Sequence, residues 1–384
     1  MLSSIFDIEF NPNKHLVHWN KIQALVQGKD VFPVTLELDI SSVCDHNCEW
    51  CVDPDGTHSF YLMPASTAQK ILKEAKSLGI HGIVFKGGGE STLHPEFAEI
   101  LETAGNLGFE VGVVTNGGKL DNQNLIAALV RYAAYVRISI DGPTPKTRQE
   151  IHGCDDFSAL IDGIEKLLAF RGAKRHPVIG ATFCLDYAHR LLLGDCIQLG
   201  EKLELDYVLI RPPFCEEVGF TSPYTPGQLA ILRHEMRTAA ENYTGELNVM
   251  IGNWISDKEL ETYPIEKIPS EMARRDLGIR QHKYNGIEHI TKQCPASPLL
   301  LVVTAEGYVY GCCCLRGIKS FSFGKIDYDD NVTLELILES DQRKHCLERM
   351  RKVECLNHCT HPLEKINTLI EYLSLPQPYH SSFI

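Results

Sequence analysis

The chain has 384 residues, 44% of them hydrophobic, and a formal net charge of −13 from 50 acidic and 37 basic side chains. This composition is typical of a globular protein and excludes a disordered or collagen-like chain. The negative charge repels phosphate groups and disfavours nucleic acid as the main partner. No apolar run of the sequence approaches the roughly 20 residues of a membrane span, and residues 1–20 lack the pattern of a signal peptide. We therefore expect a cytoplasmic protein without a membrane partner.

Short runs rich in β-branched residues alternate with longer helical patterns between about residues 34 and 212. The predicted strands are 34–40, 82–87, 110–116, 135–141, 177–186 and 206–212. The predicted helices between them are 66–79, 95–108, 122–133, 157–172 and 190–204, several of which end at a glycine. This alternation predicts parallel strands joined by right-handed crossovers, either in a doubly wound sheet or in a full or partial barrel.

The polarity of two strands favours the barrel. Polar side chains share one face of each: Thr35, Glu37 and Asp39 on the first strand, and Arg137, Ser139 and Asp141 on the fourth. Strands buried on both faces are usually apolar throughout, so a polar face indicates a sheet curled around a solvated interior. We predict a partial (β/α)6 TIM-type barrel with its site at the C-terminal ends of the strands.

The pattern changes after residue 212. A helix is predicted at 226–242 and a short strand at about 246–252, and a cysteine-rich tail begins at Cys294. The predicted organisation is a lead-in at 1–33, a barrel core at 34–225, a connecting region at 226–290, and a small cysteine-rich domain with a terminal tail at 291–384. The length prior of roughly 150 residues per domain agrees with one large and one smaller unit.

Three cysteines follow the first predicted strand at close spacing. Cys44, Cys48 and Cys51 form a C-x3-C-x2-C pattern. In a reducing compartment clustered thiols are more often metal ligands or catalysts than disulfides. Three thiolates leave a four-iron cluster or a tetrahedral ion one protein ligand short, and such an open position suits catalysis. The alternatives are a structural zinc site completed by His46 or a distant residue, and coincidence.

With Trp50 before its last cysteine, this motif resembles the cluster motif of the radical S-adenosylmethionine (SAM) superfamily. The resemblance implies that Cys44, Cys48 and Cys51 hold a [4Fe-4S] cluster whose fourth iron is chelated by SAM. It places Trp50 near the adenine, although ordinary packing also explains a tryptophan. Similarity to the family's GGE element places Gly88, Gly89 and Glu90 of the KGGGE segment at the methionine amine of SAM. A tight turn is the alternative explanation for this glycine run.

Short polar residues end the next strands. Thr115, Asn116, Ser139 and Asp141 resemble the family's contacts with the SAM ribose and carboxylate, and helix caps or turn formers are the alternative. Arg211 ends the sixth predicted strand, where it pairs with a carboxylate or phosphate or lies on the surface. Cys184 and Cys215 lie near the same ends and are candidate hydrogen-atom donors, while most remaining cysteines need no role beyond packing.

The tail resembles the SPASM or shorter twitch extension of the same superfamily. Cys294, Gly307 and Cys312 fit the opening of that motif, on a predicted hairpin that turns at the glycine. The resemblance implies an auxiliary [4Fe-4S] cluster held by Cys294, Cys312, Cys355 and Cys359, with Cys313, Cys314 or Cys346 as substitutes. Only the final C-x3-C of the family's second cysteine block is present, so one auxiliary cluster is expected rather than two. Zinc is the alternative metal for four cysteines.

The resemblance implies an enzyme that uses a 5′-deoxyadenosyl radical to take a hydrogen atom from its substrate. The expected partners are a small polar metabolite, such as a sugar, aminocyclitol or nucleotide sugar, and a reductant of the flavodoxin or ferredoxin type. The expected outcome is dehydrogenation, or epimerisation with a hydrogen-atom donor. The roughly 33 residues before the first strand leave little room for a peptide-recognition domain. The alternatives are a SPASM-type peptide maturase and a non-catalytic iron–sulfur protein.

Overall fold

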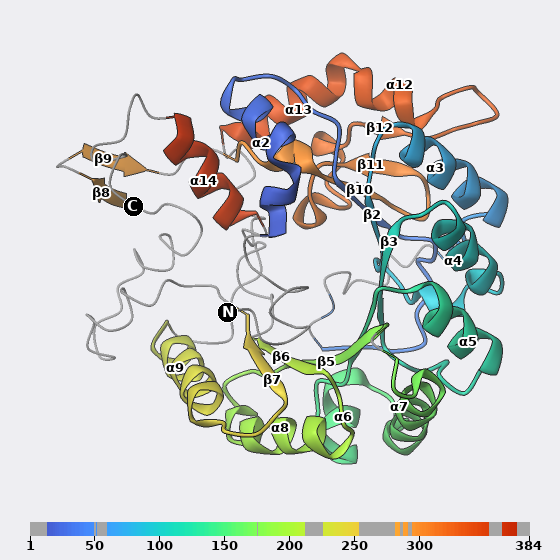
Figure 1. The fold of residues 1–384 in the computed structure, drawn as a ribbon, viewed down its shortest axis with the longest axis vertical. Coiled ribbons are helices and arrows are strands. Elements are labelled where there is room, and N and C mark those ends of the chain that lie inside the picture. Colours follow the sequence, from blue (N-terminus) through green and yellow to red (C-terminus); the bar gives the residue numbers. More distant parts are fainter. Residues whose placement is uncertain are drawn as a thin grey trace.

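The computed structural model describes residues 14–49, 51, 60–174, 176–211, 226–252, 281–284, 287–290, 294–352 and 363–374. Its main feature is a ten-stranded sheet in the order β12-β11-β10-β1-β2-β3-β4-β5-β6-β7, which curves as an open barrel (Figure 1). The strands are β1 (Thr35–Leu38), β2 (Gly82–Phe85), β3 (Glu110–Thr115), β4 (Tyr135–Ser139), β5 (Val178–Cys184), β6 (Tyr207–Arg211), β7 (Asn248–Ile251), β10 (Leu300–Val303), β11 (Tyr308–Tyr310) and β12 (Gly324–Lys325). A separate antiparallel pair consists of β8 (Gln281–Tyr284) and β9 (Ile287–Ile290).

The six strands predicted for the barrel are confirmed. They pair in parallel and in chain order from β1 to β6, and β7, predicted at about 246–252, adds a further parallel strand beside β6. The other edge differs from the six-stranded expectation, because β10 pairs in parallel with β1, with Leu300 opposite Thr35. The predicted hairpin of the tail is present as β10 and β11, and Gly307 turns it with a φ of +89°. The cysteine-rich segment is therefore continuous with the barrel sheet.

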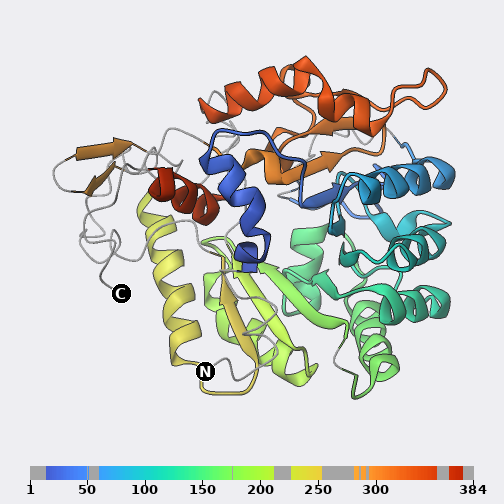
Figure 2. The ribbon, with the colours of Figure 1, turned by 45° about the horizontal axis from the view of Figure 1, so that its top comes forward.

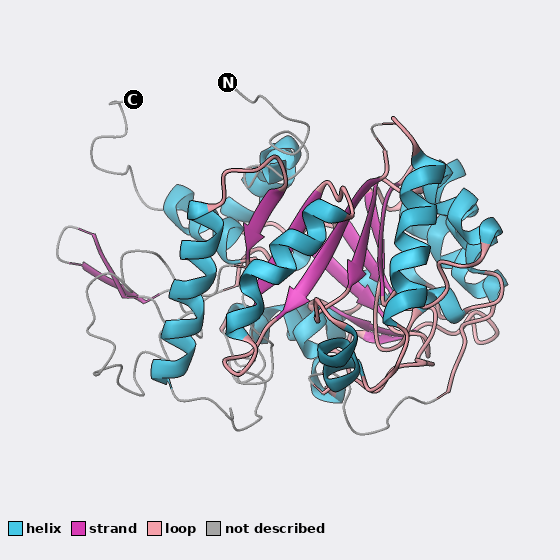
Figure 3. Cartoon of the chain, turned by 90° about the horizontal axis from the view of Figure 1, so that it is seen from below, coloured by secondary structure: helices cyan, strands magenta, loops and turns pink. Residues whose placement is uncertain are grey.

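Helices cover the outer face of the sheet (Figure 3). The helices of the barrel are α3 (Ala65–Ser77), α4 (Phe97–Asn106), α5 (Gln123–Tyr132), α6 (Pro145–His152), α7 (Phe157–Arg171), α8 (Leu193–Lys202) and α9 (Pro226–Asn242). Of these, α6 is absent from the sequence-based prediction, although Pro145 begins it and Thr144 caps it through a capping box. Outside the barrel lie α2 (Trp19–Val26), α12 (Leu334–Glu339), α13 (Asp341–Arg351) and α14 (Glu364–Ser374).

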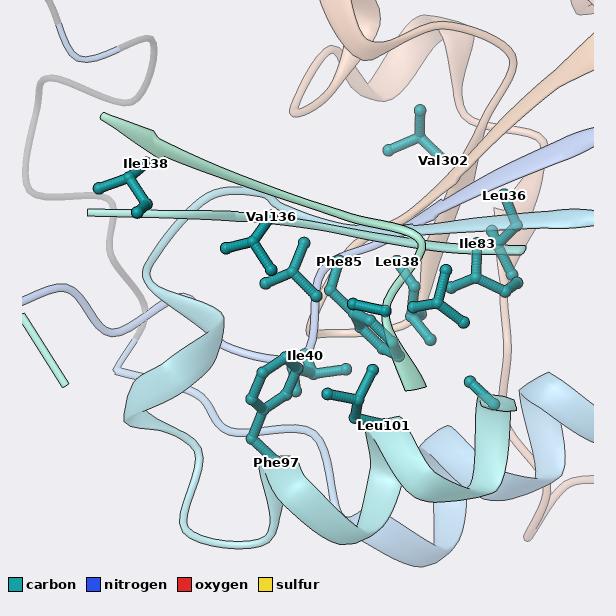
Figure 4. Close-up of a cluster of buried hydrophobic side chains, with 14 of the residues drawn as sticks. Leu36, Leu38, Ile40, Ile83, Phe85, Phe97, Leu101, Val136, Ile138 and Val302 are labelled. Carbon is teal, nitrogen blue, oxygen red and sulfur yellow. The ribbon is translucent and has the colours of Figure 1, made fainter. Parts of the chain in front are cut away.

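The two faces of β1 have opposite surroundings. Leu36 and Leu38 have no exposed surface and pack with Phe85 of β2 and with Phe97 and Leu101 of α4 (Figure 4). The alternation of side chains along a strand therefore turns the intervening residues of β1 to the interior of the barrel. The predicted polar face is thus the concave face of the sheet.

The two ends of the described chain meet beside the barrel. A small cluster joins Ile22 and Leu25 of α2 to Leu299 before β10 and Ile370 of α14 (Figure 2). Arg343 of α13 donates hydrogen bonds to the Asp30 carboxylate and adds a buried link between the same regions. Within the described part of the chain, every helix is too short or too polar to cross a bilayer.

Candidate functional site

The predicted cysteine loop leaves β1 at the C-terminal edge of the barrel, where neighbouring strand ends hold it. The Glu90 amide, after β2, donates to the Val43 carbonyl at 2.8 Å. On the other side, the Asn47 amide donates to the His152 carbonyl at the end of α6 at 3.0 Å. Between them, the Asn116 amide group donates to the Asp45 carboxylate at 2.8 Å. The loop is therefore fixed by three different strand–helix units.

The thiols of this loop lie close enough to influence one another. Burial raises the pKa of Cys44 to about 11, and Glu90 and Cys51 add to the rise. Burial also raises the pKa of Cys48 above its usual range, with Asp141, Cys51 and Cys44 contributing. Metals bind the thiolate, so a bound cation would offset this cost of ionisation. The loop thus brings the three predicted ligands together next to two further predicted site residues.

The spacing of the donor atoms bears on the choice between a cluster and a single ion. Sulfur ligands of one tetrahedral zinc ion, at about 2.3 Å from it, lie roughly 3.8 Å apart. Among the described residues, the groups whose donor atoms all lie within 4.8 Å include His46, Cys48 and His152, but none unites Cys44, Cys48 and Cys51. At least one pair of sulfurs in the cysteine trio is therefore more than 4.8 Å apart, wider than in a single zinc site, whereas His46, Cys48 and His152 are close enough to hold one ion.

Glu90 organises the strand ends beside the loop. Its Oε1 atom accepts hydrogen bonds from the Thr115 hydroxyl at 2.7 Å and from the Thr92 hydroxyl and amide at 2.7 and 3.0 Å. Its Oε2 atom accepts a hydrogen bond from the backbone N–H of Asn116 at 2.7 Å. The carboxylate is buried, with an exposed fraction of 4% for the residue. The structure therefore brings Glu90, Thr115 and Asn116 into one network, as the strand-end prediction requires.

The glycine run lies against the cysteine loop and against β1. A Cβ atom on Gly89 would lie 2.3 Å from the Val43 carbonyl oxygen, and one on Gly87 would lie 2.1 Å from the Asp39 carboxylate. The Gly88 amide donates to the Asp39 carboxylate at 3.3 Å. These close approaches explain why glycine is needed at two of the three positions and leave the predicted ligand contact as an expectation.

Asp141 lies on the opposite side of the loop, with a left-handed φ of +57°. Its carboxylate accepts the Cys184 amide at 2.7 Å and lies 2.9 Å from the His152 Nε2 atom. The other nitrogen of His152, Nδ1, is 3.4 Å from the Cys48 sulfur. Burial opposes ionisation of Asp141, but the contact with His152 and the charge of Arg211 leave its pKa below the usual value. Asp141, Cys184 and Arg211 therefore share one location, next to Cys48.

Arg148 of α6 links the C-terminal ends of β3 and β4. The side chain is fully buried, and its guanidinium donates to the carbonyls of Ser139 at 2.8 Å and Asn116 at 3.1 Å. It also donates to both carboxylate oxygens of Asp156, at 2.6 and 2.8 Å. Such a bidentate pair fixes geometry as well as charge. Arg148 therefore fixes the C-terminal ends of β3 and β4 relative to each other.

The concave face of the barrel carries a second polar layer. The Lys86 ammonium lies 2.9 Å from the Glu37 carboxylate, and the Arg137 guanidinium donates to the Tyr207 hydroxyl at 3.0 Å. Burial opposes the charge of Lys86, but Glu37 raises its pKa above the usual range. An ion pair and a hydrogen bond from a guanidinium thus line the interior predicted from the polar strand faces.

In the tail, the sulfurs of Cys312, Cys313 and Cys314 lie within 4.8 Å of one another. Among the described residues Cys294 is outside this group, and its sulfur accepts a hydrogen bond from the Asn367 amide group at 3.3 Å. Cys346 is buried in α13, with its sulfur 3.6 Å from the Ser322 carbonyl oxygen. The structure therefore places two of the three substitute ligands beside Cys312. This spacing is compatible with zinc as well as with a cluster.

Four of the predicted site residues, Trp50, Cys215, Cys355 and Cys359, lie outside the described residues. Sequence reasoning missed His152 and Arg148 on α6, and it did not give Asp45 a role. The proline and threonine at the start of α6 are local signals that predict the helix, but no sequence pattern indicates which side chains it turns toward the cysteine loop.

Comparison with known proteins agrees with this geometry. Residues 38–175 match the model of the radical SAM superfamily, and this range spans the cysteine loop, Glu90 and Asp141. The chain contains a radical SAM domain. Among solved structures, SuiB of Streptococcus suis bound to S-adenosylmethionine has a similar fold, with a TM-score of 0.61 and 17% identity over 96% of this chain and 82% of SuiB. The radical SAM fold is therefore confirmed.

Two curated relatives match parts of the chain. Mycofactocin maturase MftC of Mycobacterium ulcerans is 25% identical over 160 residues, which cover 41% of this chain and 43% of the relative. A probable GTP 3′,8-cyclase of Methanothermobacter thermautotrophicus is 31% identical over 168 residues, covering 40% of this chain and 54% of the relative. The matched region thus spans about half the length of these relatives.

Proposed function

We propose that the chain is a radical SAM enzyme that abstracts a hydrogen atom from a small polar metabolite and oxidises or epimerises it. The observation that carries this proposal is the position of Cys44, Cys48 and Cys51 on one loop, held against the Glu90 network inside the matched domain. When bound, a [4Fe-4S] cluster supplies the electron that cleaves SAM to methionine and the 5′-deoxyadenosyl radical.

The residues of this chain hold and orient those groups in the proposal. Cys44, Cys48 and Cys51 are the cluster ligands, and Gly88 and Gly89 present backbone to the methionine end of SAM. Thr115, Asn116, Ser139, Asp141 and Arg211, with Trp50, are the proposed contacts with the rest of SAM. Burial of Glu90 and Asp141, at 4% and 7% exposed, supports a site from which water is largely excluded.

The polar interior of the barrel supports a polar substrate. Glu37, Lys86 and Arg137 place charges on the concave face. Among the described residues the Oε2 atom of Glu37 has no hydrogen-bond partner, and an apolar substrate would leave it unsatisfied. A thiol near the substrate, Cys184 or Cys215, is the proposed hydrogen-atom donor for epimerisation. Burial raises the pKa of Cys184 to about 12, so it stays a thiol at neutral pH, the form that carries the hydrogen atom.

The cysteines of the tail are proposed to hold one auxiliary [4Fe-4S] cluster. Cys312 is the central ligand, with Cys294, Cys355 and Cys359 as its expected partners and Cys313 or Cys314 as substitutes. When bound, such a cluster would accept one electron from the substrate radical in a dehydrogenation, and with the loss of a proton the net change would be a two-electron oxidation. An external reductant of the flavodoxin or ferredoxin type would supply the electron for SAM cleavage.

Peptide maturation is the second candidate function. It is favoured by the similarity to the maturase MftC and by the fold of SuiB, which has also been solved bound to its precursor peptide SuiA. The two candidates differ in the substrate that stimulates SAM cleavage. A panel of sugars and aminocyclitols should do so under the first proposal, and a precursor peptide under the second.

Anaerobic reconstitution with iron and sulfide tests the radical SAM proposal. The protein should bind about eight irons if both four-iron clusters form, and it should release 5′-deoxyadenosine from SAM when reduced. Cys44→Ala should lose the first cluster and all SAM cleavage while keeping the auxiliary irons. Buried Cys196→Ala, on α8, is the matched control and should keep both properties. A zinc-only protein, or full cleavage by Cys44→Ala, would refute the proposal.

A non-catalytic iron–sulfur protein is the alternative of another class. It predicts that the first cluster has four protein ligands and that SAM leaves its electron paramagnetic resonance spectrum unchanged. The radical SAM proposal predicts a changed spectrum on adding SAM to the reduced protein, because SAM would occupy the fourth iron. This measurement separates the two classes without knowledge of the substrate.

A further inference from the structure

A cavity of about 220 Å³ lies between the end of β1 and the β10–β11 hairpin. Its walls include Asp39 and Ser42 from the segment before the cysteine loop, Gly88 after β2, and Arg316 and Lys319 after the hairpin. Drug-sized ligands usually occupy pockets of roughly 300–1,000 Å³, so this cavity suits a smaller molecule. The pairing of β10 with β1 creates it, and the sequence alone gives no sign of it.

One oxygen of Asp39 in this cavity has no hydrogen-bond partner among the residues that the structure describes. Asp39 is only 2% exposed, and its Oδ2 atom is occupied by the Arg316 guanidinium at 3.1 Å and the Gly88 amide at 3.3 Å. Its Oδ1 atom is buried without a donor. A buried polar atom left unpaired is destabilising. With Asp39 ionised, the cavity therefore offers a buried acceptor for a donor that the described residues do not supply.

The charges around the cavity favour a neutral ligand. When Asp39 is ionised, it and Glu306 are balanced by Arg316 and Lys319, and the Asp39 carboxylate is already paired with the Arg316 guanidinium. A cationic ligand would meet two cations on the same wall, and an anionic ligand two carboxyl groups. Serine, threonine and tyrosine side chains of the lining both donate and accept hydrogen bonds. This mixture matches hydroxyl groups, which also do both.

We propose that the cavity binds a neutral polyhydroxylated molecule of monosaccharide size, with one hydroxyl donating to Asp39 and others accepting from Arg316 and Lys319. This inference rests on the proposed function and assigns the cavity to its substrate. In the sequence Ser42 lies two residues before Cys44 and Arg316 two residues after Cys314. A molecule in the cavity therefore lies between the segments that carry the two proposed clusters. This position suits a substrate that first loses a hydrogen atom to the SAM-derived radical and then an electron to the auxiliary cluster.

Ligand-observed nuclear magnetic resonance at pH 8, on the reconstituted protein with SAM and no reductant, tests this site. Glucose and myo-inositol are the neutral probes, and glucosamine is the cationic one. At least one neutral probe should bind with a millimolar dissociation constant and more tightly than glucosamine. Asp39→Asn should weaken binding about tenfold. Lys319→Gln, a change of an exposed side chain with little risk to folding, should weaken it about threefold.

Lys344→Gln on α13, outside the cavity, is the matched control and should bind as the unchanged protein does. The proposal fails if neither neutral probe binds at 50 mM, if glucosamine binds more tightly, or if neither cavity variant weakens binding. It also fails if the probes bind only without SAM, because the cavity would then belong to the SAM site. Cleavage of SAM is measured separately, so a protein that cleaves SAM but binds no polyol refutes this inference alone.

Discussion

The Glu90 carboxylate accepts a hydrogen bond from the Thr115 hydroxyl at 2.7 Å, joining the segment after β2 to the end of β3. Together with the Thr92 hydroxyl and amide and the Asn116 amide, this contact gives the carboxylate four donors. An ionised carboxylate has about four acceptor positions. Three of the donors bind Oε1 and one binds Oε2, so most of the acceptor capacity of Glu90 is used within the protein. We therefore expect the segment to reach SAM through its backbone and Glu90 to act as a positioning residue.

Glu90→Gln should uncouple the strand ends without removing a cluster ligand. The amide group of glutamine would place a donor against the donors of Thr115, Thr92 or Asn116, at a cost of about 1–3 kcal/mol in the free energy of unfolding. Urea unfolding measures this loss, and equilibrium dialysis should show weaker SAM binding at an unchanged iron content.

Glu99→Gln, on the exposed face of α4, is the control for this change and should leave unfolding and SAM binding as they are. Equal SAM affinity in Glu90→Gln and Glu99→Gln would contradict the positioning role.

Gly89→Ala should displace the cysteine loop. Its methyl group would lie 2.3 Å from the Val43 carbonyl oxygen, well inside van der Waals contact, so the backbone must move. We expect a loss of more than about 2 kcal/mol in stability, in line with overpacking, and a first cluster that assembles poorly. Iron content and the thermal midpoint measure these two effects.

Gly194→Ala in α8 is the matched substitution, because a Cβ there has nothing within 4 Å. Alanine is the better helix former, so this variant should be unchanged or more stable by up to about 1 kcal/mol. If both alanine variants behave alike, the close approach at Gly89 has no bearing on the loop.

The barrel and its polar interior were predictable because they rest on local patterns. Alternation along β1 separates Leu36 and Leu38 from Glu37 and Asp39 within five residues of sequence, and the structure keeps that division. The pairing of β10 with β1 was not predictable, because it joins segments more than 260 residues apart and no local pattern encodes it.

The candidate site divides in the same way. Glu90, Thr115 and Asn116 were placed together because the ends of parallel strands meet at one edge. His152 reaches Cys48 only through the orientation of α6, and Arg316 reaches Asp39 only through the β1–β10 pairing. Such contacts depend on tertiary packing, so a single sequence gave no basis for them.

His152→Leu should change the potential of the first cluster. The His152 Nδ1 atom lies 3.4 Å from the Cys48 sulfur, while Nε2 lies 2.9 Å from the Asp141 carboxylate. Because Nε2 faces the Asp141 carboxylate, Nδ1 can donate to the Cys48 sulfur only from an imidazolium ring, and such a hydrogen bond to a ligand sulfur would stabilise the reduced, more negative cluster. Its loss, worth about 1 kcal/mol, should lower the midpoint potential by roughly 40 mV for a one-electron couple.

Redox titration followed by electron paramagnetic resonance measures the potential of the His152 variant. His345→Leu on the exposed face of α13 is the control and should leave it unchanged. An unchanged potential in His152→Leu at full cluster occupancy would show that His152 does not contact the ligand sulfur in the loaded protein.

Asp39 should make stability depend on pH in the neutral range. Burial, partly offset by Arg316, raises the pKa of Asp39 to about 7 in the folded protein, against an ordinary value of 3.8. The folded state therefore holds a proton that the unfolded state has released between these two values, so this contribution is present below about pH 4 and is lost as the pH rises toward 7. An asparagine amide does not titrate, so Asp39→Asn should not lose this contribution. Between pH 5 and pH 7.5 the free energy of unfolding of the variant, relative to that of the unchanged protein, should therefore rise by at least about 1 kcal/mol.

Urea unfolding at a series of pH values measures the difference, with Asp341→Asn, whose side chain is 97% exposed, as the control. Parallel pH profiles for Asp39→Asn and the unchanged protein would mean that Asp39 is ionised throughout this range and that its pair with Arg316 outweighs burial.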